Sequence, residues 1–139
     1  MITIVGLGPG SIDDLSLKAW RTIENTQTLY LRTKRHPCVA HFPENIKCIS
    51  FDDIYDALDE FEDVYATIAD KVIQLAKEQG DVVYAVPGDP LVGESTVTRL
   101  LSAAQKEDIK VEIVNGISFI EPMLAEIGVD ALDGMQLLD

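Results

Sequence analysis

Three short segments have the composition of ligand-binding loops, because each combines glycine with proline or with a small polar residue. They are Gly6-Leu7-Gly8-Pro9-Gly10, Pro87-Gly88-Asp89-Pro90 and Asn115-Gly116-Ile117-Ser118, called here the first, second and third loops. Glycine lets the backbone approach a ligand closely, whereas proline fixes φ and removes an N–H donor. Such loops favour recognition of a small molecule by main-chain atoms, and plain tight turns are the alternative interpretation.

The first loop differs from the two common phosphate-binding motifs. It has a proline inside its glycine pattern and lacks the third glycine of GxGxxG, which argues against a dinucleotide-binding fingerprint. Gly10 is followed by Ser11, whereas a P-loop needs a lysine and then a hydroxyl residue after its last glycine. The loop therefore indicates a different ligand.

A basic cluster and an acidic run are the other groups of charged residues. The basic cluster comprises Arg32, Lys34, Arg35 and His36. It can pair with carboxylates of a ligand, and an exposed solubilising turn explains it nearly as well. The acidic residues between positions 52 and 63 are interpreted as a solvated helix face, and no metal site is expected.

No set of side chains indicates acid–base or nucleophilic catalysis. The chain has two histidines and no Ser/His/Asp arrangement, which argues against a hydrolase. Asp13, Asp14 and Asp89 lie near the loops and could act as a base, although capping or solvated roles are commoner for such carboxylates. The sequence therefore assigns no catalytic residue.

The loops need strands and helices to position them, and the apolar pattern predicts both in alternation. The expected strands are residues 2–5, 28–31, 46–50, 81–86 and 111–114. The expected helices follow Ser16, which can cap the first, and then cover about 59–78, 93–106 and 117–127. This order predicts an α/β fold with a mostly parallel sheet of about five strands and helices on both faces. Ligands of such sheets bind beyond the carboxyl ends of the strands, where the three loops lie.

The composition excludes several classes of partner. A chain of 139 residues with 47% hydrophobic residues fits one globular domain. Its formal net charge of −13 repels nucleic-acid backbones, so we expect no nucleic-acid partner. No apolar run approaches the ~20 residues that cross a bilayer, so we expect a cytoplasmic protein without a membrane partner. Cys38 and Cys48 are expected to be reduced thiols, a disulfide between them being the alternative.

The three loops in this order resemble the successive N-terminal motifs of the tetrapyrrole (corrin and porphyrin) methylase family. The matching segments are GLGPG, VPGDP and VNGIS. The longer segments RTKRHP, VPGDPLVGESTVTRLL and GISFIEPMLAEIGVDALDGMQLLD resemble the branch of that family that is fused to a nucleotide pyrophosphohydrolase of the MazG type. The resemblance extends over essentially the whole chain.

This resemblance implies a methyltransferase that uses S-adenosylmethionine and holds it in a cleft between two α/β domains. The residues that it places at the cofactor are Pro9, Pro87, Gly88, Asp89, Val92, Gly116, Ser118 and Phe119. Those that it places at the acceptor cleft are Gly6, Gly8, Gly10, Arg32 and Arg35. Asn115 stands where the family commonly has proline, and we expect a looser third loop there.

The resemblance also implies an assembly larger than this domain. Residues 1–139 correspond to the N-terminal domain, and the C-terminal methylase domain is expected to be absent from the chain. We expect a homodimer, a small-molecule acceptor of tetrapyrrole type, and weak cofactor binding without turnover by the isolated domain. The alternatives are a noncatalytic module that binds S-adenosyl ligands or mediates oligomerisation in a pyrophosphohydrolase fusion protein, and an unrelated nucleotide-binding α/β domain.

Overall fold

A computed structural model describes all 139 residues and contains one five-stranded parallel sheet. The strands are β1 (Ile2–Gly6), β2 (Thr28–Leu31), β3 (Lys47–Ser50), β4 (Val82–Val86) and β5 (Val111–Val114). Their order across the sheet is β3-β2-β4-β1-β5, and every neighbouring pair runs parallel. The predicted α/β class and parallel sheet are confirmed.

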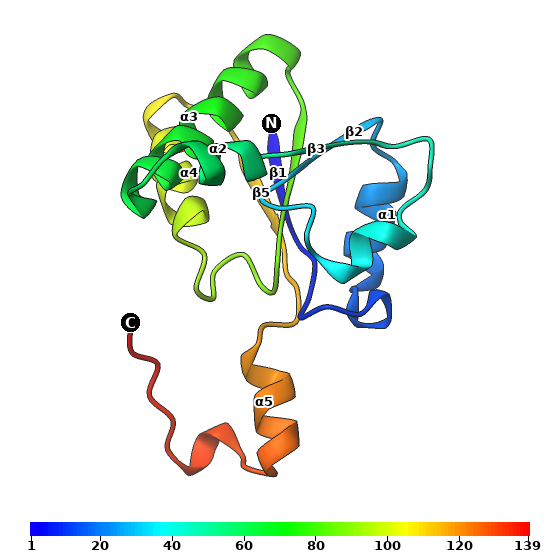
Figure 1. Cartoon of the computed structure of the whole chain (residues 1–139), viewed down its shortest axis with the longest axis vertical. Helices are drawn as coiled ribbons and strands as arrows, with labels where there is room; N and C mark the ends of the chain where they lie inside the picture. The colour runs from blue at the N-terminus through cyan, green and yellow to red at the C-terminus, as the bar shows by residue number, and fades with distance from the viewer.

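Helices cover both faces of this sheet. The α-helices are α1 (Leu17–Glu24), α2 (Asp52–Ala57), α3 (Phe61–Gln79), α4 (Ser95–Lys106) and α5 (Ile120–Ile127). Three short 3-10 segments cover Ile12–Asp14, Pro37–His41 and Ala131–Asp133. In Figure 1, α2, α3 and α4 lie on one side of the sheet and α1 lies on the other, whereas α5 projects away from both.

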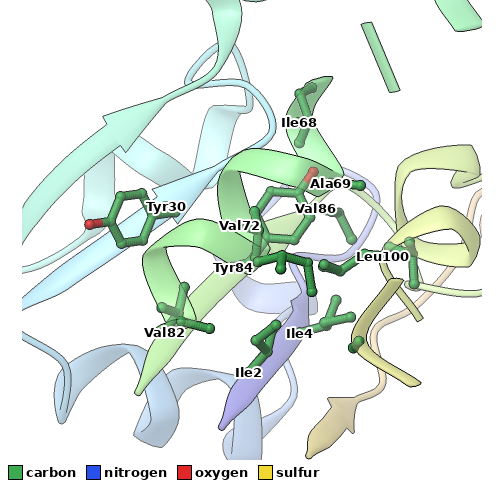
Figure 2. Packing of buried hydrophobic residues seen from close by; sticks show 14 of the residues in the cluster. Ile2, Ile4, Tyr30, Ile68, Ala69, Val72, Val82, Tyr84, Val86 and Leu100 are labelled. Carbon is green, nitrogen blue, oxygen red and sulfur yellow. The ribbon is translucent and has the colours of Figure 1, made fainter. Parts of the chain in front are cut away.

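Two hydrophobic cores, one on each face of the sheet, pack the strands against these helices. The larger core packs Ile2, Ile4 and Tyr84 of the central strands against α3 and α4 (Figure 2). The smaller core packs Val5, Leu7 and the other face of the sheet against α1 and the 37–41 segment. Because the central strands are buried on both faces, they require the continuous β-branched runs that are found in the sequence. The sheet is therefore a rigid support for the loops at its carboxyl edge.

Most element boundaries agree with the sequence pattern, and the differences have local causes. Ser16 caps α1 by accepting the N–H of Ala19 at 3.0 Å, as predicted. The helix expected from residue 117 begins at Ile120, because the Ser118 hydroxyl accepts the Ile120 N–H at 3.0 Å. The helix expected from residue 93 begins at Ser95, since Gly93 has φ +73°. A separate helix α2 was not predicted.

The connections leave the sheet in opposite directions at β1 and β4, which are neighbours. The chain passes from β1 to α1 on one face, and from β4 to α4 on the other. Open α/β sheets bind ligands at such a switch point, beyond the carboxyl ends of the strands. The topology therefore marks the first and second loops as the place for a site. None of the helices combines the length with the hydropathy that spanning a bilayer requires.

Candidate functional site

The three loops meet at the carboxyl edge of β1, β4 and β5, where their glycine backbones are in direct contact. A Cβ atom added to Gly6 would lie 2.6 Å from the carbonyl oxygen of Gly88 and 2.7 Å from the nitrogen of Gly116. A Cβ on Gly116 would overlap the same carbonyl oxygen. Gly6 and Gly116 must therefore be glycine, because main chain packs directly against main chain at both positions. Figure 1 shows that the segments leaving β1 and β5 converge here.

The first and second loops are joined by a pair of backbone hydrogen bonds. The Gly8 N–H donates to the Gly88 carbonyl at 3.1 Å, and the Gly88 N–H donates to the Gly8 carbonyl at 2.8 Å. Both residues have φ values in the left-handed region, +72° and +65°. The Leu7 N–H extends this pairing by donating to the Val86 carbonyl at 2.8 Å. The two corners are thus held at a fixed separation.

Asp89 fastens the second loop to the third. One carboxylate oxygen, Oδ2, accepts the Gly116 N–H and the Asn115 amide Nδ2, each at 3.1 Å. The other oxygen, Oδ1, accepts the Leu91 N–H at 2.9 Å. Asp89 is buried, and hydrogen bonds that a carboxylate accepts are stronger than those between neutral groups. Its carboxylate is occupied within the chain, which favours a structural function over that of a general base.

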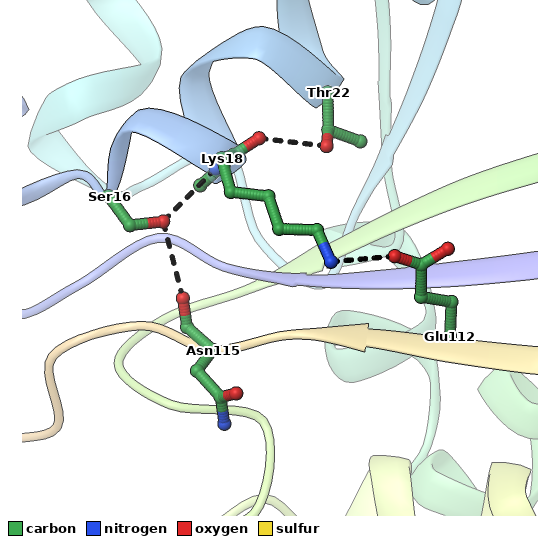
Figure 3. A network of polar contacts seen from close by, with 6 residues as sticks. Ser16, Lys18, Thr22, Glu112 and Asn115 are labelled. Atoms are coloured by element: carbon green, nitrogen blue, oxygen red, sulfur yellow. Dashed lines mark hydrogen bonds and ion pairs between the residues drawn. The ribbon is translucent and has the colours of Figure 1, made fainter.

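The third loop is also tied to the start of α1 (Figure 3). The Ser16 hydroxyl, which caps α1, donates to the Asn115 carbonyl at 3.4 Å. Lys18 in the same helix pairs with Glu112 of β5, with Nζ and Oε1 2.7 Å apart. The Asn115 carbonyl and its side-chain amide both make hydrogen bonds, which connect the third loop to α1 and to Asp89.

His36 makes a hydrogen bond with the first loop. From the sequence, His36 was assigned only to the basic cluster. Its side chain is buried, and Nε2 lies 2.9 Å from the Gly8 carbonyl oxygen. Because a carbonyl can only accept, Nε2 carries the proton and donates. Nδ1 is then the acceptor for Cys38, whose Sγ lies 3.0 Å away. Burial raises the pKa of the Cys38 thiol to about 11, so the thiol keeps the proton that it donates. No disulfide forms, since Cys38 and Cys48 are both free.

A hollow of about 230 Å³ lies between the first loop and the segment from β4 to α4. Its lining residues are Gly8, Pro9, Pro87, Gly88, Val92, Gly93, Glu94 and Phe119. The Gly93 N–H and the carbonyl oxygens of Pro87 and Val92 make no hydrogen bond within the chain. The wall therefore combines apolar surface with main-chain groups that remain available to a ligand.

A buried ionic network adjoins this hollow. Oε1 of Glu94 lies 3.4 Å from Nε of Arg32, outside hydrogen-bonding geometry, and Oε2 accepts the Thr96 hydroxyl at 3.3 Å. The Tyr84 hydroxyl donates in turn to Thr96 Oγ1 at 3.3 Å. Burial raises the pKa of Glu94, and Arg32 and Thr96 oppose that rise. The sequence indicated Arg32 as a candidate residue but not Glu94. An acidic residue at the start of a helix is common, so the sequence contains no signal that distinguishes Glu94.

The other predicted site residues lie outside the hollow. Ser118 is buried and its hydroxyl donates to Glu121, while Gly10 and Gly116 are not among the lining residues. Arg35 is exposed, and its guanidinium lies 3.9 Å from the Asp56 carboxylate.

The acidic run is not a uniformly solvated face. Asp52 is buried, and its Oδ2 accepts the Lys34 N–H at 3.0 Å, which connects α2 to the basic cluster. No three His, Cys, Asp or Glu side chains gather in a way that could hold a metal ion.

A larger groove of about 780 Å³ runs between the outer surfaces of α3 and α4. Charged and polar side chains line most of it, including Asp70, Lys77 and Arg99. It contains none of the glycine loops and lies away from the carboxyl edge of the sheet. Size alone does not identify a binding site, and the switch-point hollow is the better candidate.

Comparison with known proteins gives one family and several relatives. A family model described as tetrapyrrole (corrin/porphyrin) methylases matches residues 1–136. An uncharacterized protein, YabN of Bacillus subtilis (strain 168), is 41% identical over 139 residues, which are 99% of this chain and 28% of that protein. The methyltransferase and cyclic-peptide precursor gymMA1 of Gymnopus fusipes is 25% identical over 130 residues, covering 93% and 31% of the two chains.

Solved structures share the fold at lower identity. Diphthine synthase has a TM-score of 0.70 at 21% identity, with 94% of this chain and 50% of that chain covered. Uroporphyrin-III C-methyl transferase of Thermus thermophilus, complexed with S-adenyl homocysteine, has a TM-score of 0.61 at 22% identity, with 93% and 48% covered. The chain thus spans less than a third of these curated relatives and about half of these solved chains.

Proposed function

Because the chain belongs to the family of tetrapyrrole (corrin/porphyrin) methylases, we propose that it is an S-adenosylmethionine-dependent methyltransferase domain. The observation that carries the proposal is the convergence of the three glycine loops at the switch point of the sheet, where the first and second loops line one hollow. Methylases of the family use S-adenosylmethionine, and one solved relative holds S-adenyl homocysteine.

The residues around the hollow fit such a nucleoside ligand. Phe119 and Val92 offer apolar surface for a purine, and Pro87 and Gly93 offer unpaired main-chain groups for its hydrogen-bonding edge. The volume of about 230 Å³ is below the roughly 300–1,000 Å³ of pockets that enclose a drug-sized ligand. This chain would therefore form one wall of the cofactor site and bind only part of the ligand by itself.

The chain's contribution to methyl transfer is positioning. When bound, S-adenosylmethionine would supply an electrophilic methyl group: an acceptor atom would attack the methyl carbon in line with the S–C bond, and the neutral thioether S-adenosylhomocysteine would be the leaving group. Holding the partners in alignment can lower such a barrier by about 7–11 kcal/mol without an acid–base pair. The hydrogen-bonded pair of Gly8 and Gly88, supported by His36, gives the hollow the fixed shape that alignment requires.

The arrangement of the whole protein is part of the same proposal. Residues 1–139 form the N-terminal domain of a two-domain methylase, in the branch that carries a MazG-type pyrophosphohydrolase, and the protein is a cytoplasmic homodimer. The fraction of each relative that the chain covers, 28% of YabN and about half of the solved methylases, supports further domains. The acceptor is a small molecule of tetrapyrrole type that borders Gly6, Gly8, Gly10, Arg32 and Arg35.

Calorimetry with S-adenosylhomocysteine tests the proposal on this chain and on the full-length protein. We expect weak binding by residues 1–139 and tighter binding by the longer protein. Binding by the full-length protein without turnover of any acceptor would favour the noncatalytic module, and saturable NAD or ATP binding without a response to S-adenosyl ligands would favour the nucleotide-binding alternative. Absence of S-adenosyl binding in both proteins would refute the proposal.

A further inference from the structure

The Gly8 carbonyl group is held by two donors at once. Its oxygen accepts the Gly88 N–H at 2.8 Å and the Nε2–H of His36 at 2.9 Å, which uses both of its lone pairs. Gly8 and Gly88 line the switch-point hollow, and both have φ in the left-handed region. Because glycine adopts many backbone conformations, neighbouring groups must select the one that shapes this wall. His36 is the one side chain that donates to either glycine.

The imidazole ring of His36 is also fixed at its other nitrogen. Nδ1 lies 3.0 Å from Cys38 Sγ and accepts the Cys38 N–H at 3.4 Å. Nδ1 therefore carries no proton, and the ring proton is on Nε2, directed at the Gly8 carbonyl. The Cys38 side chain is fully buried in the core that also contains Leu7, the residue before Gly8. These contacts select one tautomer and one orientation of the ring.

The two ring nitrogens of His36 have separate functions. Through Nδ1, His36 caps the short 3-10 segment Pro37–His41, which is a local function within its own part of the chain. Through Nε2, it reaches Gly8, which lies 28 positions earlier. No residue of the 37–41 segment lines the hollow, so the cap alone does not connect His36 to a ligand there. Substitutions that keep one nitrogen's function and remove the other's can separate the two.

We propose that His36 is a positioning residue for the S-adenosyl ligand, and that it acts through Gly8 and Gly88 by donating a hydrogen bond from Nε2. The inference rests on the proposed function, since it takes the hollow as the place of that ligand. Without this donor, the Gly8 carbonyl keeps a single hydrogen bond, and its peptide group gains conformational freedom. The ligand must then order the first loop when it binds, and this entropic cost lowers the affinity.

Two substitutions of His36 test the proposal. His36→Asn keeps an acceptor near the position of Nδ1, and asparagine is a favoured cap, but its side chain is too short to reach Gly8. His36→Gln instead places an amide N–H near the position of Nε2. In calorimetry of the full-length protein with S-adenosylhomocysteine, we expect about tenfold weaker binding for His36→Asn, which corresponds to ~1.4 kcal/mol, and at most about threefold weaker binding for His36→Gln. His41→Gln, the matched control, changes the exposed histidine of the same segment and should leave the affinity unchanged.

A capping function alone predicts the opposite order, because asparagine caps better than glutamine. The inference is therefore overturned if His36→Gln binds the ligand no more tightly than His36→Asn, and the cofactor site itself remains in place. No binding of S-adenosylhomocysteine to the unmodified protein would instead refute the proposed function.

Nitrogen NMR of the two histidine rings in residues 1–139 keeps the proposal testable if the His36 variants fail to fold. We expect a protonated Nε2 and an unprotonated Nδ1 for His36. Its Nε2–H signal should shift during titration with S-adenosylhomocysteine and saturate together with the Gly8 amide. A function confined to the cap would leave this signal in place. The other tautomer, or an Nε2–H signal that does not respond when the Gly8 amide does, would overturn the inference.

Discussion

Replacing Gly6 by alanine tests whether the contact between the three loops shapes the site. Gly6 lies at the end of β1, and its φ is not in the left-handed region, so alanine is not excluded by backbone conformation. Its new Cβ would lie 2.6 Å from the Gly88 carbonyl oxygen and 2.7 and 2.8 Å from the nitrogen and Cα of Gly116. All three are main-chain atoms, which cannot rotate away as a side chain can.

The expected cost follows from the shift that this contact demands. Ordinary contacts of a Cβ begin near 3.4 Å, so the second and third loops must move by roughly 0.6–0.8 Å. Overpacking of a tight interior typically costs about 1–3 kcal/mol, and we expect Gly6→Ala to lose that much unfolding free energy. Gly10→Ala is the matched control in the same loop, because its Cβ would meet only Pro37 Cγ, at 3.9 Å. Gly10→Ala should be neutral or gain up to ~1 kcal/mol by reducing the entropy of the unfolded chain.

Urea unfolding monitored by circular dichroism measures both variants against the unmodified chain. A lower midpoint with an unchanged slope would show a loss of stability without a change in the surface exposed on unfolding. The same samples titrated with S-adenosylhomocysteine should show weaker binding for Gly6→Ala only. Equal stability of Gly6→Ala, Gly10→Ala and the unmodified chain would refute the close contact of the three loops.

Three further changes test other parts of the site. A thiol reagent at pH 8 should label Cys48 in the folded chain and Cys38 only after unfolding. Because burial raises the pKa of the Cys38 thiol from 9.0 to about 11, the free energy of unfolding should fall as the pH rises from about 9 to about 11. This fall should be smaller in Cys38→Ala. Equal labelling of both thiols would contradict this. Ser16→Ala should cost ~1 kcal/mol through the lost cap, whereas Thr22→Ala on the exposed side of the same helix should stay within about 0.5 kcal/mol; equal losses would contradict the capping function. Asp89→Asn should cost about 1.5–3 kcal/mol in urea unfolding, because an amide cannot accept at both oxygen positions, and a loss below about 0.5 kcal/mol would contradict its function as a fastener.

The strands could be predicted closely because their signal is local. The runs at 28–31 and 111–114 coincide with β2 and β5, and the run at 81–86 differs from β4 by one residue. A central parallel strand is buried on both faces, so its burial is visible as an unbroken apolar run in the sequence. The helix starts are less predictable, since a single hydroxyl such as that of Ser118 decides whether the Ile120 N–H begins the helix.

The interactions that fix the site depend on pairs far apart in the chain, which no local pattern displays. Asp89 and Gly116 are 27 positions apart, and His36 and Gly8 are 28 positions apart. Glu94 shows the same limit, because its ion-pair partner Arg32 follows a different strand, β2. The glycine loops could be found from composition and order, whereas the side chains that hold them together required the folded structure.

The measurement that tests the central claim most directly is a nitrogen–proton correlation spectrum of the chain during titration with S-adenosylhomocysteine. If the hollow between the loops holds the nucleoside, the backbone amides of Gly8, Gly93 and Phe119 will shift together and saturate with one dissociation constant. The amides of Lys77 and Arg99 in the groove between α3 and α4 will remain in place. Shifts concentrated in that groove, or none at millimolar ligand, would contradict the assignment of the site.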